Sequence, residues 1–296
     1  MDLDLGQALE LFGFAIAAAL LAGIVCPLYG AFLFVRRTSF YGIALPQFAA
    51  AGVAFGFAVL PWWAEHVGLG GLDVDTALSD THAAANYHLA WASVFTFGAL
   101  FLLASFAPTK GSEPGRLAAA FALAGSLAIL FTHWSPAGEN FVNEMLRGEI
   151  LAVGQHDFET LAVVLVAALL AIVVYHRDLV LVSFDREMAK VLGKRVRAFD
   201  LLFLVFLGGV ISVGAMTVGP IVLFGMLVLP PIAARLLARS MRSFLVLSSA
   251  IGAISALLGA WASLRWNLPM APAIVVAAGV ILALSALAAR MRGRMG

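Results

Sequence analysis

Charged residues are scarce in this chain of 296 residues: Asp, Glu, Lys and Arg make up 12% of it. A typical soluble domain contains about a quarter. Hydrophobic residues make up 62%, and the mean hydropathy is +1.00. The formal net charge of +1 provides no basic field for a phosphate backbone. The composition therefore excludes an ordinary soluble enzyme, a disordered chain and a nucleic-acid-binding protein, and it indicates a membrane protein.

Cysteine and the common catalytic motifs are almost absent as well. Cys26 is the single cysteine, which excludes an internal disulfide and a thiolate metal site within the chain. The sequence contains no His-Glu-x-x-His zinc motif, no Gly-x-Ser-x-Gly elbow and no Walker glycine loop. We therefore expect no catalytic residues and no cofactor in this chain, and any ATP that drives it must be hydrolysed elsewhere.

Long apolar runs dominate what is present. A bilayer core about 30 Å thick needs roughly 20 apolar residues of helix. This criterion predicts an all-α polytopic helix bundle. The bundle forms a single membrane domain over 1–296 and has about nine spans, with eight to ten as the expected range. The predicted spans are 9–35, 40–60, 89–107, 117–134, 158–176, 198–215, 219–236, 243–264 and 271–289. Prolines 220, 230 and 231 predict a short or broken helix in the seventh span.

The distribution of lysine and arginine predicts the orientation. With the N-terminus outside and the C-terminus in the cytoplasm, all of the 18 basic residues except Arg147 and Arg265 lie on the inner side. The centres of the spans carry almost no ionisable residues, and Glu10, His133 and Asp200 all fall near helix ends. An ion-coupled secondary carrier or channel, which usually has intramembrane charges, is therefore the alternative rather than the first interpretation, and a membrane scaffold is a third.

The longest charged stretch on the predicted inner side, 183–197, reads as a short amphipathic helix at about 184–194. Asp185 is placed to cap it and Gly193 to end it, while Phe184, Met188, Val191 and Leu192 share one face. So short a helix needs another surface for stability. A peripheral protein partner is the first interpretation, and membrane lipid headgroups are the alternative.

The same stretch resembles the Phe-Asp-x-Glu-x-Ala-x-x-x-Gly loop of permease subunits from zinc, manganese and iron ABC importers. Other elements of the chain are similar to that family in the same order. They are Arg36-Arg37-Thr38-Ser39-Phe40-Tyr41-Gly42, Ala50-Ala51-Gly52-Val53-Ala54, Leu146 to Val153, and Val218 to Arg235 with its Gly219 and Pro230.

The resemblance implies a multi-pass permease of the bacterial plasma (inner) membrane that imports divalent metal. Its implied partners are a second permease copy, identical or different, an ATPase subunit that binds ATP and Mg, and an extracytoplasmic metal-binding protein. The residues implied to couple the chain to the ATPase are Phe184, Asp185, Glu187, Ala189, Leu192 and Gly193.

The chain departs from the family pattern after Gly42, where the family has an Asp and a His four residues apart. Here those positions hold Ile43 and Gln47, which together with Met226 are the expected residues of the translocation path. Three explanations stay open. A different partner permease carries the ligands, the path conducts a metal or chelate with few direct ligands, or the chain transports another small substrate or none.

The remaining candidates are weaker. His82 and His88 are possible metal ligands, although an interfacial Trp anchor with a solvated polar loop is the first interpretation of that region. Gly42, Gly52 and Gly219 indicate close helix contacts, and Pro230 a local change in helix geometry. The metal itself is not indicated.

Overall fold

A computed structural model describes residues 5–67, 85–105, 113–135, 153–291 and 293. Within these ranges every regular element is a helix: α1 (Leu5–Val35), α2 (Tyr41–His66), α4 (Ala85–Ser105), α5 (Glu113–His133), α7 (Gln155–Val174), α8 (His176–Phe184), α9 (Arg186–Val191), α10 (Val196–Thr217), α11 (Pro220–Leu237), α12 (Met241–Trp266) and α13 (Met270–Met291). Nine of the described helices are long and apolar enough to span a membrane, which confirms the predicted number.

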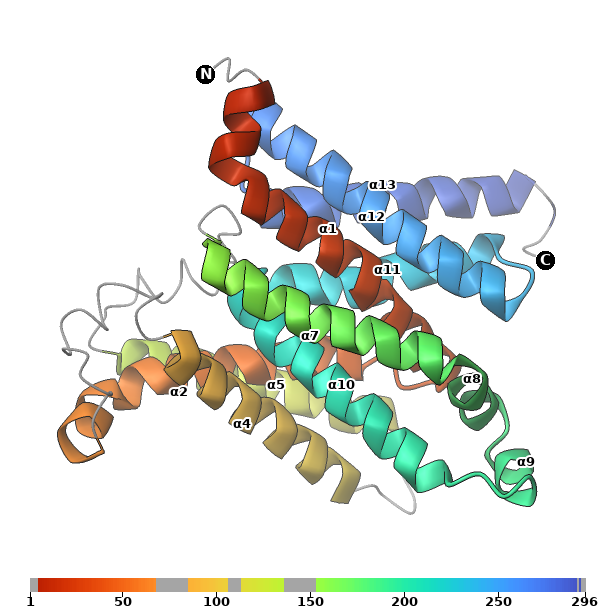
Figure 1. Cartoon of the computed structure of the whole chain (residues 1–296), viewed down its shortest axis with the longest axis horizontal. Helices are drawn as coiled ribbons and strands as arrows, with labels where there is room; N and C mark the ends of the chain where they lie inside the picture. The colour runs from red at the N-terminus through yellow and green to blue at the C-terminus, as the bar shows by residue number, and fades with distance from the viewer. Residues whose placement is uncertain (1–4, 68–84, 106–112, 136–152, 292, 294–296) are drawn as a thin grey trace.

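The helices form two packed groups joined along the middle of the molecule (Figure 1). In one group, α2 packs against α4 and α5, and in the other α11, α12 and α13 pack against one another. α1 lies along α12 and also contacts α7 and α11, while α10 contacts α2, α4 and α7. The short helices α8 and α9 lie together at one end of the bundle, the end predicted to face the cytoplasm.

Small residues set the closest helix crossings. A Cβ atom added to Gly252 on α12 would overlap the carbonyl oxygen of Gly23 on α1. A Cβ at Gly52 on α2 would lie 2.5 Å from the carbonyl oxygen of Trp91 on α4, which fits the close contact predicted for this glycine. In lipid, where water does not drive helices together, such close backbone approach supplies much of the packing energy.

The seventh span differs in detail from the prediction. α11 is short, at 18 residues, but it continues through Pro230 and Pro231. The interruption lies before it, at Gly219, whose φ of +89° favours glycine and allows the chain to turn between α10 and α11. Proline at the first helical position is tolerated because that N–H has no partner within the helix. Pro230 is buried in the helix interior.

Gly252→Val tests the α1–α12 crossing. Because the added side chain would overlap the α1 backbone, we expect destabilisation of about 3 kcal/mol, the upper end for overpacking. Thermal unfolding of the purified protein in detergent measures it. Gly279→Val on α13 is the matched control, since a Cβ there meets nothing within 4 Å. Equal unfolding temperatures for the two variants would contradict the crossing.

Candidate coupling site and translocation path

α9 is a helix of six residues, about one and a half turns, and it is capped at both ends. The Asp185 carboxylate accepts a hydrogen bond from the Met188 N–H at 2.8 Å, as predicted for an N-cap. At the other end, the Gly193 N–H donates to Lys190 O and the Lys194 N–H to Ala189 O, both at 2.9 Å. This is a Schellman ending, and the φ of +72° at Gly193 confirms glycine as the terminator.

The helix is shorter than the predicted 184–194, and Phe184 does not begin it. Phe184 is the last residue of α8, a helix that was not anticipated between the fifth span and the loop. The extended backbone of Asp185, with φ −141° and ψ 94°, separates the two helices. Asp185 therefore ends α8 and caps the start of α9. The stretch predicted as one helix at about 184–194 is divided between the end of α8 and the separate helix α9.

Burial divides the α9 region into two faces. Ala189 is fully buried against its neighbours. The side chains predicted to share an apolar face are exposed: Phe184 at 64%, Met188 at 49%, Val191 at 81% and Leu192 at 56%. Four apolar side chains at one end of a membrane protein, on elements this short, are typical of a surface that another protein covers.

Arg36 ties this region to the membrane helices. From the end of α1, its Nη1 pairs with Asp200 Oδ1 at 2.8 Å, and its Nε donates to Ser183 Oγ at 2.9 Å. Arg186, the first residue of α9, also pairs with Asp200. The Arg36 guanidinium lies 4.3 Å from the centre of the Phe203 ring. We call these five residues the Arg36 network. It joins α1, α8, α9 and α10.

The network is partly shielded from water, because the side chains of Arg36 and Asp200 are only 13% and 21% exposed. Burial lowers the pKa of the Arg36 guanidinium, and the Asp200 carboxylate opposes that effect. The guanidinium stays charged, because arginine side chains keep their proton in proteins. Arg36 Nη2 is buried without a hydrogen-bond partner among the described residues, which makes Arg36 depend strongly on Asp200.

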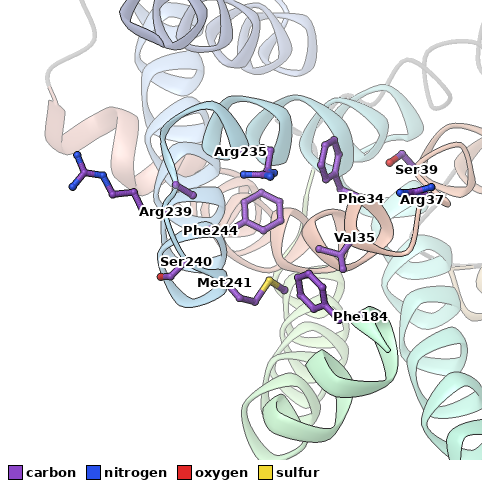
Figure 2. A pocket seen from close by; sticks show the side chains of 11 residues that line it. Phe34, Val35, Arg37, Ser39, Phe184, Arg235, Arg239, Ser240, Met241 and Phe244 are labelled. Carbon is purple, nitrogen blue, oxygen red and sulfur yellow. The ribbon is translucent and has the colours of Figure 1, made fainter. Parts of the chain in front are cut away.

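A pocket of about 590 Å³ opens beside Phe184 (Figure 2). Phe184 lies next to Val35 and Met241, and Arg235 lies beside Phe244. The pocket is lined by the end of α1, the following loop, α8, the end of α11 and the start of α12. Its cationic side chains are Arg37, Arg235 and Arg239. The surface around the exposed apolar face is therefore basic.

The predicted path residues are only partly brought together. Ile43 and Gln47 lie one turn apart on α2, and both are half-buried. Gly42 is buried, and a Cβ there would lie 3.3 Å from Leu227 Cβ, so α2 and α11 approach closely at the start of this turn. Met226, by contrast, is 1% exposed within the hydrophobic core.

The structure does not place the two candidate histidines, His82 and His88, in a metal-binding arrangement of described residues. His82 lies outside the described residues. His88 is fully buried, with its ring stacked on Phe57 at 3.8 Å between centroids and edge-on to Tyr87. In the described part of the chain, no three His, Cys, Asp or Glu side chains gather in a group that would hold a metal ion.

Sequence reasoning missed Asp200 as a functional residue. The sequence marks it only as an ionisable residue near a helix end. In the structure, its carboxylate forms ion pairs with both Arg36 and Arg186. The available signal was an acidic residue in the first turns of a span, directly after the basic stretch 194–197. Its partner Arg36 lies 164 residues earlier, so spacing within the chain did not reveal the pair.

Nine of the described helices are long and apolar enough to span a membrane, and α9 at one end is capped and stands beside an exposed apolar face. These features place the chain in the class of multi-pass membrane proteins. The chain belongs to the ABC 3 transport family, whose sequence pattern matches residues 8–289. It is therefore a transport subunit of an ABC system in a bacterial membrane, and ATP is hydrolysed by a separate subunit.

Individual relatives agree with that assignment. The chain is 28% identical over 271 residues to the manganese transport system membrane protein MntC of Halalkalibacterium halodurans, covering 92% of this chain and 85% of that protein. It is 37% identical over 142 residues to the manganese import system permease protein ScaB of Streptococcus pneumoniae, but this match spans 48% of the chain and only 51% of ScaB.

Among solved structures, PsaBC from Streptococcus pneumoniae in complex with Fab superposes with a TM-score of 0.76 and 26% identity. The superposition covers 94% of this chain and 93% of that one. The helix arrangement in Figure 1 is thus similar to that of the matched chain in PsaBC.

Asp200→Asn tests the Arg36 network. Loss of the carboxylate charge leaves Arg36 without its ion pair and frees Arg186, so we expect α9 to open more often. Hydrogen exchange at Met188 and Ala189, followed by mass spectrometry, should accelerate about tenfold, as a loss of about 1.4 kcal/mol requires. Arg197→Gln, which removes an exposed charge nearby, is the control. Unchanged exchange in Asp200→Asn would show that the network does not hold α9.

Proposed function

We propose that this chain is the membrane-spanning subunit of an ATP-driven importer of divalent metal, with manganese as the principal substrate among manganese, zinc and iron. The observation that carries the proposal is the α9 segment, with its capped ends, buried Ala189 and exposed apolar face. Support for manganese comes from relatives such as MntC, whose name states manganese transport and which matches nearly the whole chain.

The α9 segment suits the transmission of force from an ATPase. Its exposed apolar side chains supply the contact, and Ala189 leaves no room for α9 to shift against the chain behind it. The Arg36 network then connects α9 through Asp200 to α10 and α1. A second ion pair, Lys194 to Asp178 at 2.7 Å, connects the end of the loop to α8. A displacement of α9 therefore acts on the ends of several helices together.

The partners of this assembly are an ATPase subunit that binds ATP and Mg, a second permease and an extracytoplasmic metal-binding protein. Two permeases form the path between them, and α2 contributes Ile43 and Gln47. An aliphatic side chain and a neutral amide bind a metal ion weakly. The metal either passes largely hydrated, or a different second permease supplies the charged ligand and the imidazole.

Ala189→Glu tests coupling. A carboxylate in this fully buried position would displace α9, so we expect metal uptake to fall at least tenfold while the protein still inserts into the membrane. Uptake of radioactive manganese by cells measures the effect. Ala198→Glu, at an exposed alanine on α10, is the matched control. Full uptake by Ala189→Glu would overturn the coupling role, and uptake that persists without any ATPase would support an ion-coupled carrier or channel.

The double variant Ile43→Asp with Gln47→His tests the path. One turn of helix places the new carboxylate and imidazole side by side, and this pair suits zinc better than the present residues do. We expect zinc to compete several-fold more strongly with manganese uptake. Ile43→Asn alone is the control for polarity without charge. Competition that stays at the wild-type level would place the selectivity of the path away from these residues.

A further inference from the structure

An apolar groove runs along the outer face of the bundle between α7 and α12, with α1 as its floor. Both flanking helices pack against α1, and Figure 1 shows the three side by side. The groove has a volume of about 820 Å³. Ile24 and Leu28 form the floor, Leu169 and Val173 one wall, and Val246 and Ala250 the other.

The ionisable groups of the groove are confined to one end. His176, the first residue of α8, and Arg242, in the first turn of α12, both line it there. Arg242 is exposed, and its guanidinium makes no ion pair or hydrogen bond with any residue in the described part of the chain. Deeper in the groove, the Ser249 hydroxyl donates to Ile24 O at 2.9 Å, so its hydrogen is already used.

The length of the groove matches one leaflet. Its α12 wall extends from Arg242 to Ala253, about 16 Å at 1.5 Å per residue. Half of a hydrocarbon core about 30 Å thick is about 15 Å. A molecule whose charged end lies at Arg242 would therefore extend its apolar part to about the bilayer midplane.

The α12 wall of the groove carries small side chains at Ala250 and Ala253, which leave a slot along that wall. A lipid chain has the narrow, extended shape that fits it.

From these features we infer that the groove binds one phospholipid with an anionic headgroup, whose phosphate is held by Arg242 and His176 and whose acyl chain lies between α7 and α12. Arginine pairs strongly with phosphate, and basic pockets between helices on the cytoplasmic side are suited to anionic headgroups. The bound lipid would connect α7, just before α8, to the start of α12, which lines the basic pocket beside Phe184.

Native mass spectrometry of the purified permease, with its partner subunits where they co-purify, tests the site. Phosphatidylglycerol or phosphatidylcholine is added to delipidated protein in mild detergent. We expect one phosphatidylglycerol to be retained at least fivefold more than phosphatidylcholine. Arg242→Ala should abolish this preference, and Ala253→Trp should reduce retention of both lipids by filling the slot. Arg290→Ala, an exposed arginine in the last turn of α13, should behave as wild type.

Two results would overturn the inference. One is equal retention of the two lipids, or an unchanged preference in Arg242→Ala. The other is efficient disulfide formation between copies carrying Val246→Cys, which would assign the groove to a second chain. Because the assay measures lipid and not uptake, its failure leaves the proposed transport function untouched, and a failure of transport leaves the lipid site testable.

Discussion

The ion pair between Arg36 and Asp200 is the interaction on which the end of the molecule that carries α8 and α9 depends. It is largely shielded from water, and it draws together residues from α1, α8, α9 and α10 that are far apart in the chain. A helix of six residues has little stability alone, so α9 depends on its caps, on the burial of Ala189, on the pairing of Arg186 with Asp200, and on the ion pair between Lys194 and Asp178. The exposed apolar face is thereby presented on a rigid base.

The membrane imposes the second constraint. Without a hydrophobic force between helices in lipid, the bundle depends on close backbone approach, as at Gly23 with Gly252 and at Gly52 with Trp91. The crossing at Gly252 holds α1 against α12, while an apolar groove lies between α12 and α7. The same architecture thus combines a central helix, whose end is followed by Arg36, with an apolar groove along its side.

Local features were predictable from the sequence, and long-range ones were not. Scarcity of charge marked the nine spans, and Asp185 and Gly193 marked the ends of α9, because a cap depends on residues within one turn. The break between Phe184 and Asp185 was missed because α8, with nine residues that include Arg177 and Asp178, is too short and too charged to meet the criterion for a span. The pairing of Arg36 with Asp200, the burial of Met226 and the groove depend on how separate helices meet. Only the folded chain shows these.

Crosslinking at Val191 tests the central claim most directly, that α9 is the surface on which an ATPase docks. Val191 is 81% exposed, and the single native cysteine, Cys26, is fully buried, so Val191→Cys introduces one accessible thiol. With a short thiol-to-amine crosslinker in native membranes, we predict one major product that contains the ATPase and whose yield changes when ATP is added. Val276→Cys, on the exposed face of α13, should give none. If the Val191→Cys variant still transports metal but forms no crosslinked product with the ATPase, the account is contradicted.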